Sequence, residues 1–138
     1  MGVTLTLLAM LGVKPGLAAA GDREADAAMS ALVTAVRKRD RRRLHALFCQ
    51  GGQVHYLDTL ERPHRRSAID CRNAEDLDDL LFGDDGFRDY VMMGGRRAWR
   101  AKSPLLYVPP YATGDDIHVR WRRQGRTLVI EELAMPSG

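Results

Sequence analysis

Residues 117–133 read IHVRWRRQGRTLVIEEL, a run in which apolar and polar side chains alternate on both sides of a Gln-Gly pair. A period of two is typical of a β-strand, and a glycine between two such runs indicates a hairpin turn. With the Gln-Gly pair at the turn, Trp121 would face Leu128 and Val119 would face Ile130. The sequence therefore predicts a two-stranded ribbon with one apolar face.

The opposite face of this ribbon is polar. It carries His118, Arg120 and Arg122 beside Glu131, and we expect these side chains to lie in solvent or at the rim of the domain. Further strands are expected before the ribbon, and they cover residues 53–59, 98–102 and 105–108. Pro109 and Pro110 end the last of these, because proline cannot donate to a strand ladder.

Three segments in the first two thirds of the chain have the apolar spacing of amphipathic helices. Each follows a residue whose side chain can accept a hydrogen bond from the first turn of a helix. These predicted helices are residues 23–38 after Asp22, a short helix after Asp40 that ends before Gly51 and Gly52, and residues 74–82 after Asn73, with a polar stretch around Pro63 before the third. Helices packed on one face of a curved, cone-like antiparallel sheet make an α+β domain.

The N-terminus has the pattern of an export signal. Residues 3–13 are uncharged and apolar, and Ala18 and Ala20 form an Ala-x-Ala cleavage site before the charged residues that follow. No Lys or Arg precedes the run, so a frayed helix of a cytosolic protein stays as the alternative. We expect residues 1–20 to be a signal peptide, residues 21–138 to be one α+β domain, and the protein to be periplasmic or secreted.

Cys49 and Cys71 are the only cysteines in the chain. In an oxidising compartment a lone pair predicts one structural disulfide, whereas in the cytosol two reduced thiols would be expected. There is no Cys-x-x-Cys pair, so thiol-disulfide catalysis and a cysteine-based zinc site both lack their residues.

The chain carries a formal charge of +3, and its cations are unevenly distributed. The run of residues 37–43 is strongly basic and can neutralise phosphates. An exported protein rarely meets nucleic acid, so an anionic lipid surface or an acidic partner is the favoured ligand. A solvated junction between two helices is the alternative. The acidic side chains of residues 75–85 are expected on the exposed face of a helix. The basic patch consists of Arg37, Lys38, Arg39, Arg41, Arg42 and Arg43.

Part of the chain resembles the nuclear transport factor 2-like (SnoaL-like) superfamily. The segments ALVTAVRKRD at 31–40 and LHALF at 44–48 are similar to its first two helices, and residues 119–130 are similar to its closing strand pair. The resemblance implies a cone whose curved sheet wraps a pocket. Members of the superfamily include isomerases, cyclases and modules that only bind, so the resemblance does not choose a function.

In that fold a general base could be His55, Asp58 or His118, in a pocket lined by aromatic side chains. Alternation along the strand places His55 on the face opposite to Tyr56 and Asp58, so not all of them can share one pocket. No two histidines have the spacing of a ready metal site, and no cofactor motif is present. The candidate pocket residues are His55, Tyr56, Asp58, Tyr107, His118 and Trp121.

The sequence thus favours an exported cell-envelope binding or accessory protein over an enzyme, and assigns no catalytic residue, cofactor or metal. A superfamily enzyme with a His or Asp base is the first alternative, and a basic nucleic-acid-binding module is the second. Its partner would be a small molecule, an anionic lipid surface or an envelope protein. Homodimerisation stays open.

Overall fold

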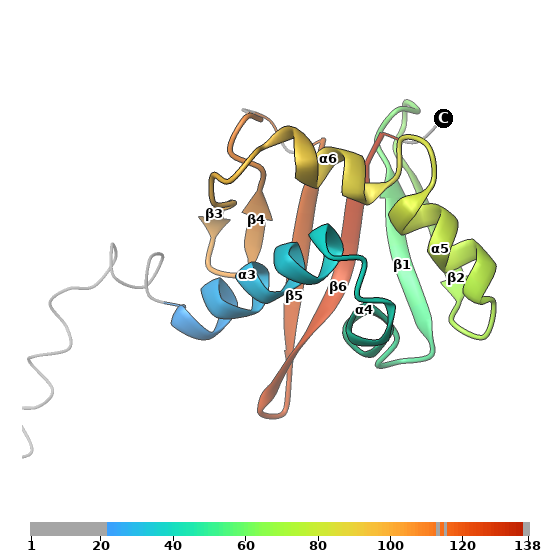
Figure 1. Cartoon of the computed structure of the whole chain (residues 1–138), viewed down its shortest axis with the longest axis horizontal. Helices are drawn as coiled ribbons and strands as arrows, with labels where there is room; N and C mark the ends of the chain where they lie inside the picture. The colour runs from blue at the N-terminus through green and yellow to red at the C-terminus, as the bar shows by residue number, and fades with distance from the viewer. Residues whose placement is uncertain (1–21, 113, 115, 137–138) are drawn as a thin grey trace, which may run out of the picture.

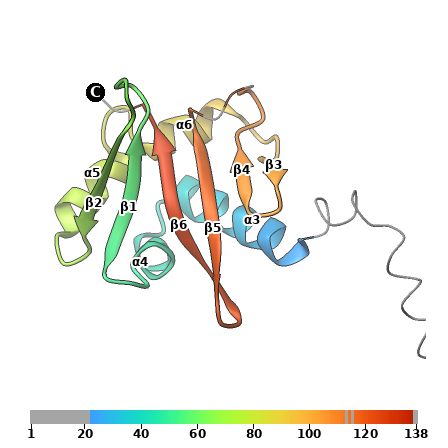
Figure 2. The ribbon, with the colours of Figure 1, turned by 180° about the vertical axis from the view of Figure 1, so that it is seen from behind.

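The structure, a computed structural model, describes residues 22–112, 114 and 116–136. Helices lie in one layer against a twisted sheet, and the view from behind shows that the other face of the sheet carries no helix (Figures 1 and 2). The α+β class is confirmed. The expected signal peptide at residues 1–20 lies outside the described residues.

In the part of the chain that the structure describes, six strands form one mixed sheet in the order β2-β1-β6-β5-β4-β3. All neighbours are antiparallel except β1 and β6, which run parallel, so the prediction of a wholly antiparallel sheet was wrong. The sheet does not close, and β2 and β3 form its edges. The strands are β1 (Gln53–Asp58), β2 (Arg65–Asp70), β3 (Arg100–Ser103), β4 (Leu106–Val108), β5 (His118–Gln124) and β6 (Thr127–Met135).

Four helices within the described residues cover the other layer, and the three predicted from the sequence are confirmed. Their predicted N-caps are also present, because Asp22, Asp40 and Asn73 accept hydrogen bonds from the backbone of the first turn. The fourth helix was not predicted, since it has only seven residues and no side-chain cap. The helices are α3 (Arg23–Arg37), α4 (Arg41–Phe48), α5 (Ala74–Phe82) and α6 (Phe87–Met93).

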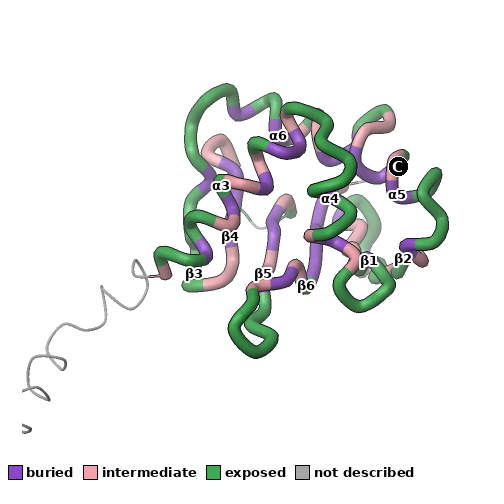
Figure 3. The backbone as a smooth tube through the Cα atoms, turned by 60° about the horizontal axis from the view of Figure 1, so that its bottom comes forward, coloured by how far each residue is buried: buried purple, intermediate pink, exposed green. Residues whose placement is uncertain are grey.

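The core lies between the helices and the sheet, where the buried positions of α3, α4, β5 and β6 meet (Figure 3). Leu32 and Leu44 come from the helices, and Val119, Trp121 and Leu133 come from the sheet. Trp121 is 1% exposed, which confirms the predicted apolar face of the ribbon.

The register of the β5–β6 hairpin differs from the predicted one. Trp121 pairs with Ile130, and Val119 pairs with Leu133. The reason is that Gly125, with φ of 64°, is the first of two loop residues rather than the second, as in a type II′ turn.

A β-bulge lies in the same hairpin, where Glu131 stands between two register segments and has no partner in the ladder. The extra residue moves Leu133 opposite Val119 on the core face. It also moves Glu132 opposite Arg120, on the face without helices.

The polar stretch after Pro63 contains strand β2, which the sequence did not predict. This strand pairs only with β1, and none of its six residues is buried. An edge strand lacks the apolar alternation of a half-buried strand, so its sequence gave too weak a signal.

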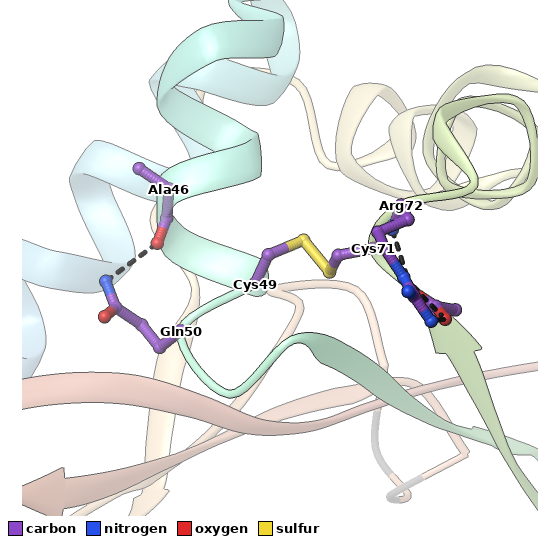
Figure 4. The surroundings of a disulfide bond; sticks show 6 residues. Ala46, Cys49, Gln50, Cys71 and Arg72 are labelled. Atoms are coloured by element: carbon purple, nitrogen blue, oxygen red, sulfur yellow. Dashed lines mark hydrogen bonds and ion pairs between the residues drawn. A yellow bond between two sulfur atoms is a disulfide. The ribbon is translucent and has the colours of Figure 1, made fainter.

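The disulfide between Cys49 and Cys71 is confirmed, with the two α-carbons 5.8 Å apart. It joins the C-cap of α4 to the residue after β2 (Figure 4). The backbone N–H of Cys71 also donates to the carbonyl of Gly52. The bridge therefore ties the helical layer to the edge of the sheet. Among the residues that the structure describes, no helix is long and apolar enough to cross a membrane.

Candidate functional site

A cavity with a volume of about 530 Å³ opens along α3. One wall is the face of α3 that runs from Asp26 to Arg37, and the opposite wall is the segment 96–99 before β3. Tyr107 of β4 completes the lining. We call this cavity the α3 pocket. Its apolar surface comes from Met29, Val33, Ala98 and Trp99, and its polar surface comes from Asp26, Ser30, Thr34, Arg37, Arg96, Arg97 and Tyr107.

Tyr107 and Asp26 form a hydrogen bond in this pocket, with the phenolic O–H as donor and the carboxylate as acceptor. Burial raises the pKa of Tyr107, and the hydrogen bond to Asp26 and its negative charge raise it further. The phenol therefore stays protonated at neutral pH. It holds the Asp26 carboxylate in place and cannot act as a base.

Arginines supply the positive charge of the α3 pocket. One N–H of Arg37 donates to the carbonyl of Gly95, and Nε of Arg97 donates to the carbonyl of Gly94 at 3.4 Å. Each guanidinium has five N–H donors, so these contacts orient the side chain and leave other donors for an anion. Arg96 is exposed beside them. Three cations from two segments thus converge on a cavity that has apolar walls.

The six residues predicted from the sequence do not share one pocket. Tyr107 alone lines the α3 pocket, and Trp121 is part of the core. Tyr56 lines a second cavity of about 520 Å³, and His55 lines a third of about 300 Å³ with Arg66 and Arg122. Asp58 ends β1 and accepts a hydrogen bond from the backbone N–H of Leu60.

His118 lies on the predicted face of β5, but the prediction that this face leaves it in solvent was wrong. Its Nε2 lies 3.1 Å from Oε1 of Glu132, and both side chains are buried. Oε2 of Glu132 is 2.8 Å from a guanidinium nitrogen of Arg66, which reaches over from the sheet edge. The bulge in β6 brings Glu132 to this face, and the long side chain of Arg66 covers the pair.

The second cavity is acidic, since Asp76, Asp79, Asp84 and Asp85 line it with Tyr56. In the described part of the chain, no group of three His, Cys, Asp or Glu residues is arranged to hold a metal ion.

The basic patch predicted from residues 37–43 makes several structural contacts. Nε of Arg41 pairs with Asp78 at 3.0 Å, and the guanidinium groups of Arg39 and Arg41 lie over the ring of Phe82. Arg37 turns toward the α3 pocket. The remaining three, Lys38, Arg42 and Arg43, are exposed.

Comparison of the chain with family models, curated proteins and solved structures finds no match. The site must therefore be judged on its own residues. Sequence reasoning missed Asp26, Arg96 and Arg97, because an aspartate on a helix surface and an arginine pair after two glycines are both common in exposed segments. Only their positions across one cavity set them apart.

Proposed function

We propose that this protein is an exported binding module whose α3 pocket holds a small anionic molecule with an apolar body. The observation that carries the proposal is the convergence of Arg37, Arg96 and Arg97 on a cavity walled by Met29 and Trp99. Guanidinium groups match carboxylates and phosphates through paired N–H donors. A volume of about 530 Å³ is in the range of small-molecule sites.

The Asp26 carboxylate adds a second requirement for the ligand. One of its oxygens accepts from Tyr107, which leaves acceptor capacity on the pocket side of the group. A ligand with a hydroxyl or amine a short distance from its anionic group would satisfy it. An anion without such a donor would meet repulsion from Asp26, so this residue favours hydroxy or amino acids over plain ones.

Binding is better supported than catalysis. The enzyme alternative needs a His or Asp base in a pocket, but the described lining of the α3 pocket contains no histidine, and its aspartate, Asp26, is engaged by Tyr107. We also propose that the chain is related to the nuclear transport factor 2-like superfamily, and the helical layer on one face of a twisted sheet supports this. The disulfide supports export.

Calorimetry with matched soluble ligands tests the pocket. We expect an aryl or alkyl hydroxy acid to bind the protein at least about tenfold more tightly than its neutral amide, because the amide loses the charge-assisted contacts to the arginines. Val33→Trp fills the cavity and should abolish binding, whereas Ala27→Trp, on the same helix but not in the lining, should not. Equal affinity for acid and amide, or equal binding by both tryptophan variants, would refute the proposal.

Export has its own test. N-terminal sequencing of the protein from the envelope fraction of a bacterial host should find Gly21 as the first residue. Protein with an intact Met1 in the cytosolic fraction would contradict export without touching the pocket.

A further inference from the structure

The end of α6 carries an exposed apolar pair beside two cations. Met92 is 41% exposed and Met93 is 63% exposed, and Arg96 and Arg97 are also exposed. Elsewhere in the described chain, Leu60 is the one other large apolar residue that is strongly exposed. We call residues 92–97, which read MMGGRR, the Met-Arg knuckle.

The knuckle is a folded turn. The N–H of Gly94 donates to Val91, that of Gly95 to Met92, and that of Arg97 to Gly94, at 3.1–3.3 Å. Gly94 is buried against Pro110, where an added Cβ would lie 3.1 Å from the ring. This backbone holds both methionines outside the core, so their exposure is built into the fold.

Cations outnumber acids around the knuckle, where Asp26 lines the α3 pocket with Arg37, Arg96 and Arg97. Arg37 donates to the carbonyl of Gly95, and Arg88 donates to the carbonyl of Arg37 at 3.1 Å, so both lie next to it. Lys38 follows Arg37 and is exposed. The acidic residue of α6, Asp89, accepts from the backbone of Asp85 at the other end of the helix.

We propose that the Met-Arg knuckle docks on the surface of an anionic lipid bilayer. The flexible, unbranched methionine side chains would enter the headgroup layer, and the arginines would contact lipid phosphates. A second copy of the chain would bring like charges together, which disfavours self-association here. A polyanion such as nucleic acid would use the cations but would have no need of the methionines. This docking does not depend on what the α3 pocket binds, although Arg96 and Arg97 border both.

Co-sedimentation with vesicles tests the docking. We expect binding to vesicles of phosphatidylcholine and phosphatidylglycerol, weakening with salt, and none to phosphatidylcholine alone. Arg96→Glu/Arg97→Glu should lower the partition constant at least about 25-fold, because each basic side chain near an anionic surface contributes about fivefold. Met92→Ser/Met93→Ser should lower it by roughly tenfold, because apolar contact is lost.

Two variants serve as matched controls. Leu60→Ser removes an exposed apolar side chain after β1, and Arg126→Glu reverses a charge in the β5–β6 turn, at the end of the molecule opposite to α6 (Figure 1). Leu60→Ser, the control for the methionine variant, should change vesicle binding by no more than about twofold. Arg126→Glu, the control for the arginine variant, should lower binding far less than Arg96→Glu/Arg97→Glu does.

The outcomes separate this proposal from the one on the pocket. The methionine double variant should keep its affinity for soluble ligands of the α3 pocket and should lose its binding to vesicles. Equal partitioning of that variant and the native protein would overturn the docking. Equally strong binding to neutral and to anionic vesicles would also overturn it. So would binding to a polynucleotide that the arginine variant weakens and the methionine variant leaves unchanged.

Discussion

A single carboxylate organises the helix-free face of the sheet. Glu132 is buried between His118 of β5 and Arg66 of β2, so its two oxygens join three strands. A buried acid is costly unless its oxygens are paired, and here each oxygen has a cation or an imidazole beside it. Its sequence neighbour Glu131 is exposed and sits at the bulge. Two adjacent glutamates thus have very different environments.

We expect Glu132→Ala to lower the free energy of unfolding by about 1–3 kcal/mol, because it removes the buried contacts of this carboxylate with His118 and Arg66. Glu131→Ala is the matched control and should change it by less than about 0.5 kcal/mol. Urea denaturation of both variants measures the difference. Similar midpoints for the two would show that the buried cluster contributes little.

The pKa of Tyr107 gives a prediction in alkaline solution. Its folded-state pKa is raised by burial and by Asp26, so the neutral phenol stabilises the fold below pH 10 and this contribution is lost as pH rises toward the folded-state pKa. Burial also raises the pKa of Tyr111, to about 12. Thermal melts should therefore fall in midpoint above about pH 10.

Tyr107→Phe should make that decline shallower and should cost about 1 kcal/mol at neutral pH through the lost hydrogen bond. Tyr111→Phe would leave the Tyr107 contribution in place. If the Tyr107→Phe and native curves ran parallel through the alkaline range, the phenol would not be the group that titrates.

At the scale of elements, the β5–β6 hairpin shows how turn geometry sets which side chains reach the core. Gly125 takes a left-handed conformation at the first loop position, and this fixes the pairing of Trp121 with Ile130. The bulge then corrects the alternation further along, so that Val119 and Leu133 meet on the core face. Without it, Glu132 would point into the core.

Gly125→Ala should lower the free energy of unfolding by about 1–2 kcal/mol, because an L residue is strained at this positive φ. Gly51→Ala is the control, since neither glycine has a neighbour within 4 Å of an added Cβ and Gly51 does not have a positive φ. Equal stability of the two variants by chemical denaturation would argue against the assigned turn.

At the scale of the whole molecule, the bridge between Cys49 and Cys71 links α4 to the segment between β2 and α5. These elements lie at one end of the sheet, where β2 pairs only with β1. The two cysteines are 22 residues apart in the sequence, so their cross-link lowers the conformational entropy of the unfolded chain. It also anchors this edge of the sheet.

Cys49→Ser/Cys71→Ser should lower the free energy of unfolding by about 3 kcal/mol, as expected for closure of a loop of this length. Native protein treated with reductant should melt at the temperature of the double variant, whereas reductant should leave the variant unchanged. If reductant under unfolding conditions did not change the melting temperature of the native protein, the disulfide would be contradicted.

The helix caps, the apolar face of the hairpin and the disulfide could be predicted from the sequence. Asp22, Asp40 and Asn73 cap helices because their side chains satisfy N–H groups of the next turn, an interaction of residues three apart. The apolar face around Trp121 and the pairing of the two cysteines were likewise predictable, because alternation and a lone cysteine pair each leave few solutions.

Tertiary structure decided the rest, because it depends on residues far apart in the chain. The strand β2 exists through its pairing with β1, and the buried pair of His118 and Glu132 depends on a bulge and on Arg66 from the edge strand β2. The α3 pocket joins Asp26 to Tyr107 and sets both against Arg96, three residues with no shared local pattern. A helix or a cap is stabilised by neighbours within a few positions, whereas a cavity is what packed elements leave between them, so only the folded chain reveals it.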